Sequence, residues 1–307
     1  MESVSIENYI RDCFFIKLMD RSSEIEILEK MNADNLYING EEYRKKHNEV
    51  KKNNIKEALR DNKKLILLDL ACGRGGDLGK WQNIDKCCRV VAVDVCKDSV
   101  KEAIDRYNKV YKKKDSRMKV FFIGGIDLTE QSAMHDIGNT IRRRRLSSDF
   151  NVISCQMALN YFIESEIILL NLLEIVSKYL VSGGIASFSA LNGHKIIELL
   201  DGKEEHMSDG VYVKSVNIEE DIDYFNCYGM MYKIFIADSN SKADSYFKHK
   251  GFSSEFLCFP ETLMRIIKNN KQLRLRFWSK GKNSFELNGF GDHKISKLFF
   301  YFFLQKY

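Results

Sequence analysis

The chain has 307 residues, a formal net charge of +5 and a hydrophobic content of 44%. That content supports a buried core and excludes a wholly disordered protein. No apolar run approaches the roughly 20 residues that span a bilayer, and the first residues carry acids within any apolar stretch, so we expect neither a membrane partner nor a secretory signal.

Short apolar runs alternate with helix-length segments through the first two thirds of the chain. The strand-like runs are 65–70, 89–95, 119–126, 150–155 and 184–190, and the clearest helical segments are 97–112 and 164–180. Strands that alternate with helices form right-handed crossovers within a parallel sheet. We therefore predict an α/β, Rossmann-like fold with a mainly parallel, doubly wound sheet.

The alternation stops after residue 204. Residues 205–247 are polar and rich in aromatic side chains, which predicts short antiparallel strands in a lid insertion. Two late strands are expected at 253–259 and 297–306. One proline and no flexible linker indicate a single domain, 1–307, made of an N-terminal helical arm (1–60), a cofactor-binding core (61–204), the lid (205–247) and C-terminal strands that complete the sheet (248–307).

Basic residues gather at three places in the sequence. They are 112–114 with Arg117, then 142–145, and finally Arg274, Arg276, Lys280 and Lys282. Any one of these groups could be a solvated face. Three of them in one modestly basic chain favour a polyanionic partner.

The stretch LLDLACGRGGDLGKW at 67–81 places a glycine-rich loop directly after a strand. A P-loop is excluded because no Gly-Lys-Ser/Thr follows the glycines. A dinucleotide fingerprint needs a third glycine three residues after the second, and Gly79 is one residue off. Asp77 would also repel a pyrophosphate at this place. The loop therefore favours a cationic ligand without phosphate.

S-adenosylmethionine is such a ligand, because it carries a sulfonium and an ammonium. Asp69 and Asp77 could meet the ammonium, Asp94 ends the second strand where it could accept from the ribose hydroxyls, and Asp127 follows the third strand near the adenine amino group. One acid at a strand end is often a helix cap. Acids at the ends of three successive strands beside a glycine turn predict this methyl donor, with no metal.

These residues resemble one family, the messenger RNA cap guanine-N7 methyltransferases. The family loop LDLGCGKGGDL-x-KW is similar to LDLACGRGGDLGKW, and the family segment SCQFALHYSFES is similar to SCQMALNYFIES at 154–165. Similarity continues at NNIK (53–56), AIDRYN (103–108) and SGGIASFSALNG (182–193), and covers roughly residues 50 to 200. The resemblance implies a class I S-adenosylmethionine methyltransferase fold with an antiparallel last strand.

The resemblance also implies roles for individual residues. It implies a cofactor pocket, with S-adenosylhomocysteine as the product, formed by Lys56, Asp69, Ala71, Gly73, Asp77, Asp94, Val95, Asp127, Leu128, Gln156 and Tyr161. It implies substrate contacts from Asn53, Arg74, Arg106, Asn160 and Phe299. Two guanidiniums can hold a polyphosphate bidentately, although Arg74 and Arg106 could also be ordinary surface arginines.

The guanine pocket departs from the family pattern. The family has a histidine where this chain has Asn160, and a tyrosine in the final strand where it has Phe299. A family glutamate in the lid precedes a tyrosine in a strand. The nearest match here places Met231 at that position, with Glu219, Glu220 and Asp221 as substitutes by location only.

The expected reaction is transfer of the methyl group to guanine N7 of a 5′-capped mRNA by in-line displacement. It needs no nucleophile or base from the protein, so catalysis is expected from electrostatics and from positioning by Asn160 and Tyr161. Two alternatives stay open: a methyltransferase with another RNA or protein substrate, and a non-catalytic RNA-binding subunit. Other capping-enzyme domains or subunits are further possible partners.

The location of the protein follows from its cysteines and composition. Eight scattered cysteines without metal-ligand spacing predict reduced thiols in the nucleus or cytoplasm and not a secreted protein. A composition rich in Lys, Asn and Ile with one proline is typical of AT-rich genomes. A viral or parasite version, located in the host cytoplasm or virion if viral, is a hypothesis from that composition.

Overall fold

The structure, a computed structural model, describes residues 65–82, 87–111, 118–208, 211–236, 252–280 and 298–306. The expected N-terminal arm, with Asn53 and Lys56, lies outside the described residues, as do 112–114, Arg117 and Lys282. No helix in the described part is long and apolar enough to cross a membrane.

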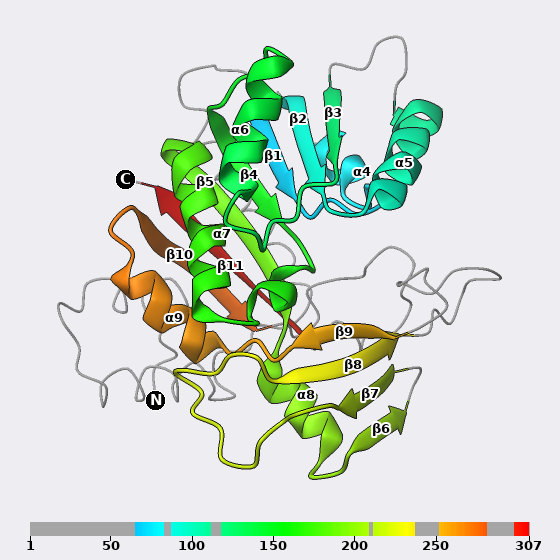
Figure 1. The fold of residues 1–307 in the computed structure, drawn as a ribbon, viewed down its shortest axis with the longest axis vertical. Coiled ribbons are helices and arrows are strands. Elements are labelled where there is room, and N and C mark those ends of the chain that lie inside the picture. The colour runs from blue at the N-terminus through cyan, green and yellow to red at the C-terminus, as the bar shows by residue number, and fades with distance from the viewer. Residues whose placement is uncertain are drawn as a thin grey trace, which may run out of the picture.

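A seven-stranded sheet forms the centre of the fold, in the order β10-β11-β5-β4-β1-β2-β3 (Figure 1). Neighbours from β5 to β3 pair in parallel, whereas β11 is antiparallel to both β5 and β10. The strands are β1 Leu65–Leu70, β2 Cys87–Asp94, β3 Lys119–Gly124, β4 Phe150–Cys155, β5 Leu180–Leu191, β10 Leu273–Lys280 and β11 Phe299–Lys306. The predicted sheet, parallel except at its last strands, is confirmed.

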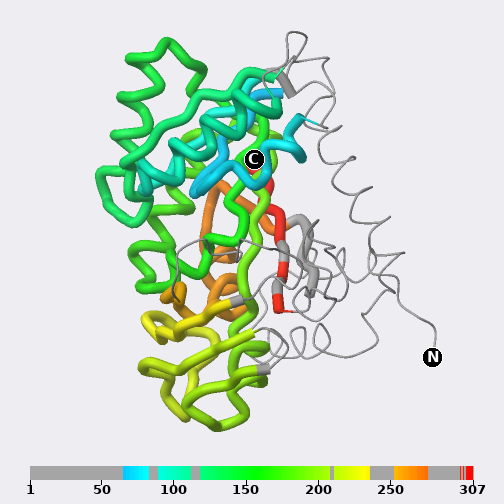
Figure 2. Tube along the Cα trace, turned by 90° about the vertical axis from the view of Figure 1, so that its right-hand side faces the viewer, coloured from blue at the N-terminus to red at the C-terminus, as the bar shows by residue number. Residues whose placement is uncertain are grey.

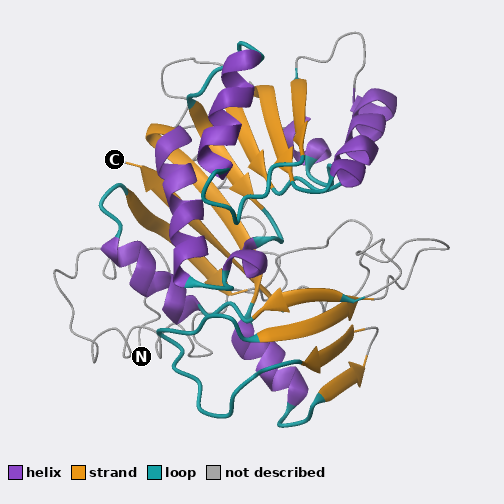
Figure 3. Cartoon of the chain, in the orientation of Figure 1, coloured by secondary structure: helices purple, strands orange, loops and turns teal. Residues whose placement is uncertain are grey.

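Helices cover both faces of this sheet (Figure 3). The described helices are α4 Leu78–Gln82, α5 Lys97–Arg106, the π-helix η2 Tyr107–Tyr111, α6 Ala133–Arg143, the 3-10 helix η3 Leu159–Phe162, α7 Glu166–Tyr179, α8 Gly193–Leu200 and α9 Pro260–Asn269, of which α8 packs on the lid sheet described below. Strand β1 shows why the sheet needs helices on both faces. Leu65 and Leu67 pack with α4 and η2, while Leu68 and Leu70 pack with α6 and α7. Burial on both faces explains the unbroken apolar run of this strand.

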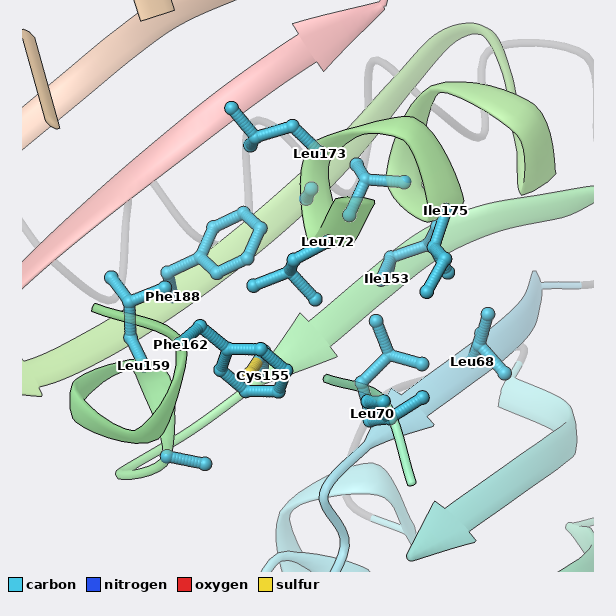
Figure 4. Close-up of a cluster of buried hydrophobic side chains, with 14 of the residues drawn as sticks. Leu68, Leu70, Ile153, Cys155, Leu159, Phe162, Leu172, Leu173, Ile175 and Phe188 are labelled. Atoms are coloured by element: carbon cyan, nitrogen blue, oxygen red, sulfur yellow. The ribbon is translucent and has the colours of Figure 1, made fainter. Parts of the chain in front are cut away.

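Helix α7 packs on the centre of the sheet. Figure 4 shows Leu172 of α7 between Phe188 of β5 and Ile153 of β4, all of them buried. The helix begins where the Ser165 hydroxyl accepts a hydrogen bond from Ile168 N at 3.3 Å, which satisfies one of the backbone donors left unpaired at a helix start. This cap places the preceding segment, η3, beside the end of β4.

A smaller antiparallel sheet forms the lid, in the order β6-β7-β8-β9. Its strands are β6 Glu205–Ser208, β7 Val211–Ser215, β8 Met231–Ile236 and β9 Ser253–Phe256. They lie past the end of the main sheet, at the lower end of the molecule in Figures 1 and 2. Helix α8 covers one face, where Ile196 and Leu200 pack with Val213 and Ile234.

Two elements differ from the sequence expectation. The run at 253–259 was expected to complete the main sheet, but Ser253–Phe256 pairs with β8, so the lid extends beyond residue 247. The place at the edge of the main sheet is taken by β10, in a segment read only as a basic tail. The choice of sheet depends on distant pairing partners that the local pattern does not encode.

Candidate active site

The glycine loop after β1 folds back onto the end of β2. Cys72 N donates to Val93 O at 3.0 Å, and Gly73 N donates to an Asp94 carboxylate oxygen at 2.7 Å. Gly73 has a φ of +50°, and a Cβ added there would meet nothing within 4 Å. Gly75 has a φ of +70°, and its added Cβ would lie 2.6 Å from Leu78 Cδ1. Gly75 therefore serves the packing of the loop, while the open side of Gly73 leaves room for a ligand.

Asp69, near the end of β1, is a buried carboxyl at the base of this loop. It is 3% exposed, and one oxygen accepts a hydrogen bond from Trp81 Nε1 at 3.1 Å. Burial, and then the charge of Asp77, raise the pKa of Asp69 to about 8. Asp77 forms an ion pair with Lys80. A cation placed beside Asp69 would favour its ionised form, so the base of the loop suits a positively charged ligand.

The acid that ends β2, Asp94, and the acid that follows β3, Asp127, are held in fixed orientations. Asp94 accepts from Gly73 N with one oxygen and from Cys96 N at 2.8 Å with the other. Asp127 uses its Oδ1 atom for both Thr129 N, at 2.9 Å, and the Thr129 hydroxyl, at 2.7 Å. A carboxylate oxygen has two lone pairs, so both side chains keep acceptor capacity toward hydroxyl or amino groups.

Arg74 projects from the loop onto α5. Its Nε atom lies 3.5 Å from a Glu102 carboxylate oxygen, while its Nη1 atom is buried and has no hydrogen-bond partner among the described residues. Arg106 is exposed and follows Glu102 by four positions, so both lie on one face of α5. A buried guanidinium nitrogen without a partner is costly unless an acceptor arrives. This arrangement can receive an anion at the edge of the loop.

The segment after β4 closes the other side of the site. Gln156 Nε2 donates to Ser187 O at 2.9 Å, and Met157 N donates to the Ser189 hydroxyl at 2.8 Å. Met157 has a φ of +58°, as Ala71 has +54°. Non-glycine residues in this region cost about 1–3 kcal/mol, and such strain is concentrated at functional sites.

Asn160 ties the main sheet to the lid. It is 2% exposed; its carbonyl oxygen accepts from Leu191 N at 2.8 Å, and its amide donates to Leu191 O and Phe256 O, both at 3.1 Å. A further bond, to the Tyr232 hydroxyl, measures 3.3 Å. The amide is thus used by the protein itself, and the guanine contact expected of Asn160 stays a prediction.

Glu255 is the site residue that sequence reasoning missed. It lies in β9, is 2% exposed, and accepts hydrogen bonds from the hydroxyls of Ser253 (3.1 Å), Tyr232 (3.2 Å) and Tyr161 (3.4 Å). Burial raises the pKa of Glu255 to about 7, against the effect of these three donors. Strand alternation in SSEFL places this acid on the same face as Leu257, and a charged residue on a buried face was the available signal.

The expected lid acids lie elsewhere. Met231 begins β8, one residue before the buried Tyr232. Glu219, Glu220 and Asp221 are exposed in the loop between β7 and β8. Among the lid residues that the structure describes, the buried carboxyl is Glu255, directly opposite Tyr232 in the register of β8 and β9.

Tyr161 connects the two halves of the site. Its hydroxyl lies 2.8 Å from the Ser253 hydroxyl and reaches Glu255 in the lid. Burial and the charge of Glu255 raise the pKa of Tyr161, and Asp94 in the main sheet adds to the shift. The tyrosine therefore lies within the electrostatic reach of both carboxylates.

The described cofactor-pocket predictions all fall near the carboxyl ends of β1, β2, β3 and β4, which are neighbours in the sheet. Two members of this set differ in exposure: Val95 is 55% exposed, whereas Leu128 is buried. Phe299 begins β11 opposite Leu191, the residue held by Asn160. Among the described residues no group of three or more His, Cys, Asp or Glu side chains could hold a metal ion.

The sequence of this chain is similar to those of known proteins. Residues 25–247 match the model of the mRNA (guanine-N(7))-methyltransferase domain, which agrees with the resemblance drawn from the sequence. A protein of Schizosaccharomyces pombe (strain 972 / ATCC 24843) named mRNA cap guanine-N(7) methyltransferase is 27% identical over 187 residues, covering 59% of this chain and 48% of the relative.

Two further relatives carry similar names. The mRNA cap guanine-N(7) methyltransferase 1 of Oryza sativa subsp. japonica is 32% identical over 181 residues, covering 56% of this chain and 46% of the relative. The mRNA cap guanine-N(7) methyltransferase of Caenorhabditis elegans is 37% identical over 112 residues, covering 36% and 27%. This chain matches less than half the length of each of these three relatives.

Proposed function

This chain belongs to the mRNA (guanine-N(7))-methyltransferase family, and on that premise we propose that it transfers the methyl group of S-adenosylmethionine to guanine N7 of capped RNA. When bound, this cosubstrate supplies an activated methyl group on a sulfonium. The chain's own residues then have two tasks, which are to hold the donor and to orient the guanine.

The fit of the donor rests on the loop after β1. The pKa of Asp69 is raised by burial and by Asp77, so a bound ammonium would relieve an unfavourable charge balance. Asp94 and Asp127 keep acceptor capacity at the next two strand ends. Gly73 leaves an open surface at the same place. These features suit a cationic nucleoside and disfavour a pyrophosphate.

The fit of the guanine rests on Glu255. We propose that its carboxylate accepts hydrogen bonds from the N1–H and amino groups of the base. Methylation at N7 puts positive charge on the ring, and an oriented carboxylate in a water-poor site stabilises that charge. Tyr161, Tyr232 and Ser253 hold the carboxylate through their hydroxyls.

The reaction requires no general base, because guanine N7 carries an unprotonated lone pair. Holding that nitrogen in line with the methyl group and sulfur can account for about 7–11 kcal/mol of the barrier. In this proposal Arg74, whose buried Nη1 atom has no hydrogen-bond partner in the described part of the chain, binds the cap phosphates. Arg106 on the neighbouring face of α5 assists it.

The observation that carries the proposal is the buried Glu255, which accepts a hydrogen bond from Tyr161 in the segment that follows β4. The test is methyl transfer from labelled donor to GpppG, with GpppG already methylated at N7 of both guanines as the control acceptor. We expect label on the first and none on the second. Label on protein or on an internal RNA site, with none on the cap, would support a related methyltransferase with another substrate.

A second candidate function has one observation in its favour. Asn160 replaces the family histidine, and its amide is used within the protein. If donor binding is absent in calorimetry while capped RNA binds, the non-catalytic RNA-binding subunit is the better description.

Location and partners belong to the same proposal. The five described free cysteines, Cys72, Cys96, Cys155, Cys227 and Cys258, support a reducing compartment such as the nucleus or cytoplasm. Partners beyond capped RNA would be other capping-enzyme domains or subunits. A viral source, with a place in the host cytoplasm or virion, keeps only the support of composition.

A further inference from the structure

One face of the lid sheet carries aromatic side chains that the methyl-transfer site does not use. Tyr212 of β7 lies opposite Phe235 of β8, and Phe252 immediately precedes β9. The ring centroids of Tyr212 and Phe252 are 4.8 Å apart, and those of Phe235 and Phe252 are 6.1 Å apart. Met207 of β6 lies opposite Tyr212. We call these four residues the aromatic face.

The aromatic face is turned away from the core of the lid. In β7 and β8 the alternate residues Val213, Ile234 and Tyr232 are buried on the side covered by α8. Successive side chains of a strand point to opposite faces, so Tyr212 and Phe235 point to the other side. Met207 is 81% exposed and Phe252 is 53% exposed. Met207 and Phe252 are therefore open to a partner, and Tyr212 and Phe235 beside them are partly buried.

Two lysines accompany the rings. Lys214 and Lys233 are exposed, lie directly opposite each other in β7 and β8, and share the face of Tyr212 and Phe235. Glu205 lies 3.7 Å from the Lys214 ammonium and accepts a hydrogen bond from the Tyr212 hydroxyl at 2.7 Å. The Glu205 carboxylate fixes the orientation of the Tyr212 ring. Because two lysines stand beside one glutamate, a net positive charge remains next to this ring.

The aromatic face begins next to the proposed guanine pocket, on the other side of the edge strand β9. Phe252 is followed by Ser253, whose hydroxyl contacts Tyr161 at 2.8 Å and Glu255 at 3.1 Å. From Phe252 the row crosses the strands toward Met207 at the far strand, β6. Glu255 points to the buried side of the sheet with Tyr232, so a chain attached to a guanine there would pass the edge of β9 to reach Phe252, the first ring.

Building on the proposed function, we propose that the aromatic face binds the first nucleotides of the RNA that follow the cap. Their bases stack on Phe252, Phe235 and Tyr212, and their phosphates lie near Lys214 and Lys233. Exposed aromatic rings on a sheet, flanked by cations, are the arrangement by which proteins bind single-stranded RNA with little sequence preference. The rings and lysines together favour RNA over an apolar protein segment.

The test compares two acceptors, GpppG and a GpppG-capped RNA of about ten nucleotides, long enough to cover a single-strand binding site. In the Tyr212→Ala/Phe252→Ala double variant, we expect KM for the capped RNA to rise about tenfold, as loss of base stacking implies. KM for GpppG should not change. Phe252→Trp should keep the KM of the unmodified protein, and Ile167→Ala, an equally exposed apolar site on α7 at 61%, is the matched control.

Two direct readouts accompany the kinetics. A capped RNA with 2-aminopurine as its second nucleotide should lose fluorescence on binding the unmodified protein, because a stacked base is quenched, and should lose less with the double variant. In Lys233→Gln, the slope of log affinity against log salt should fall by about 0.7, the value for one contact to a single strand.

Three outcomes overturn the proposal. The first is equal KM values for the capped RNA in the unmodified protein and the double variant, with GpppG still methylated. The second is a parallel rise of KM for both acceptors, which would place the rings in the cap pocket. The third is a change in oligomeric state by light scattering without a change in RNA binding. Failure of the unmodified protein to methylate GpppG would instead reject the proposed function.

Discussion

The donor loop after β1 and the junction between Asn160 and Glu255 are built in opposite ways. In the loop, partners are close in sequence: Gly73 bonds Asp94, 21 residues away, and Asp69 bonds Trp81, 12 residues away. At the junction, Asn160 bonds Phe256, 96 residues away, and Tyr161 bonds Glu255, 94 residues away. Local sequence therefore determines the donor side, whereas long-range packing assembles the acceptor side.

The two regions also resemble each other in one respect. Each holds a buried carboxyl whose pKa is raised, Asp69 to about 8 and Glu255 to about 7, and burial is the largest cause in both. Asp69 has acidic neighbours, while Glu255 has hydroxyl donors. The first is suited to a full positive charge and the second to N–H donors of a neutral base that becomes charged during the reaction.

The largest expected effect is that of a substitution at Glu255, which should impair use of the acceptor and leave donor binding unchanged. Glu255→Gln should lower kcat/KM for GpppG about 100- to 1000-fold, in line with the loss of an oriented electrostatic group. The Kd of the donor, measured by calorimetry, should stay within the error of the unmodified protein. Glu220→Gln, an exposed acid in the same lid, is the control and should keep full activity. A weakened donor Kd in Glu255→Gln would show that the two regions are not independent.

The reverse effect is expected at the loop. Asp94→Asn should weaken the donor about tenfold or more, because a charge-assisted hydrogen bond contributes about 1.5–3 kcal/mol. The affinity for a cap analogue in the absence of donor should be unchanged. Asp98→Asn, four residues along and at the start of α5, is the matched control. If cap binding falls together with donor binding, the separation of the sites is wrong.

Asn160→Ala tests the hydrogen bonds by which Asn160 connects the main sheet to the lid. Removing the amide leaves the buried Leu191 N and the Phe256 carbonyl without this partner, so unfolding free energy should fall by about 1–3 kcal/mol. The change should appear in denaturant unfolding and as a higher KM for GpppG, with kcat reduced far less than by loss of a covalent nucleophile. A complete loss of turnover in a folded protein would contradict catalysis by positioning.

The smallest effect concerns pH. The raised pKa of Asp69 means that the folded protein without donor keeps a proton that the unfolded chain releases above about pH 3.8. The contribution of Asp69 to the free energy of unfolding therefore decreases as pH rises from about 4 to about 8. Donor binding should strengthen over the approach to pH 8, by at most about tenfold per pH unit. Calorimetry across this range should show that slope, and Asp69→Asn should flatten it.

The sequence by itself determined the parallel sheet, its order of apolar runs, and the acids at the ends of β1, β2 and β3. Those features depend on periodicity and on the rule that carboxyl ends of parallel strands share an edge. Gly73 and Asp94 could be paired from the sequence for the same reason, because each stands at a strand end beside the other.

Only the tertiary structure decided the acceptor side. The local pattern of 253–259 fits a strand in either sheet, and pairing with β8 placed Glu255 opposite Tyr232 instead of in the main sheet. The same pairing used the amide of Asn160 as a joint and left the aromatic face open. A strand's neighbours are chosen by the whole set of buried surfaces, and that choice turned an ordinary glutamate into the buried carboxyl of the lid.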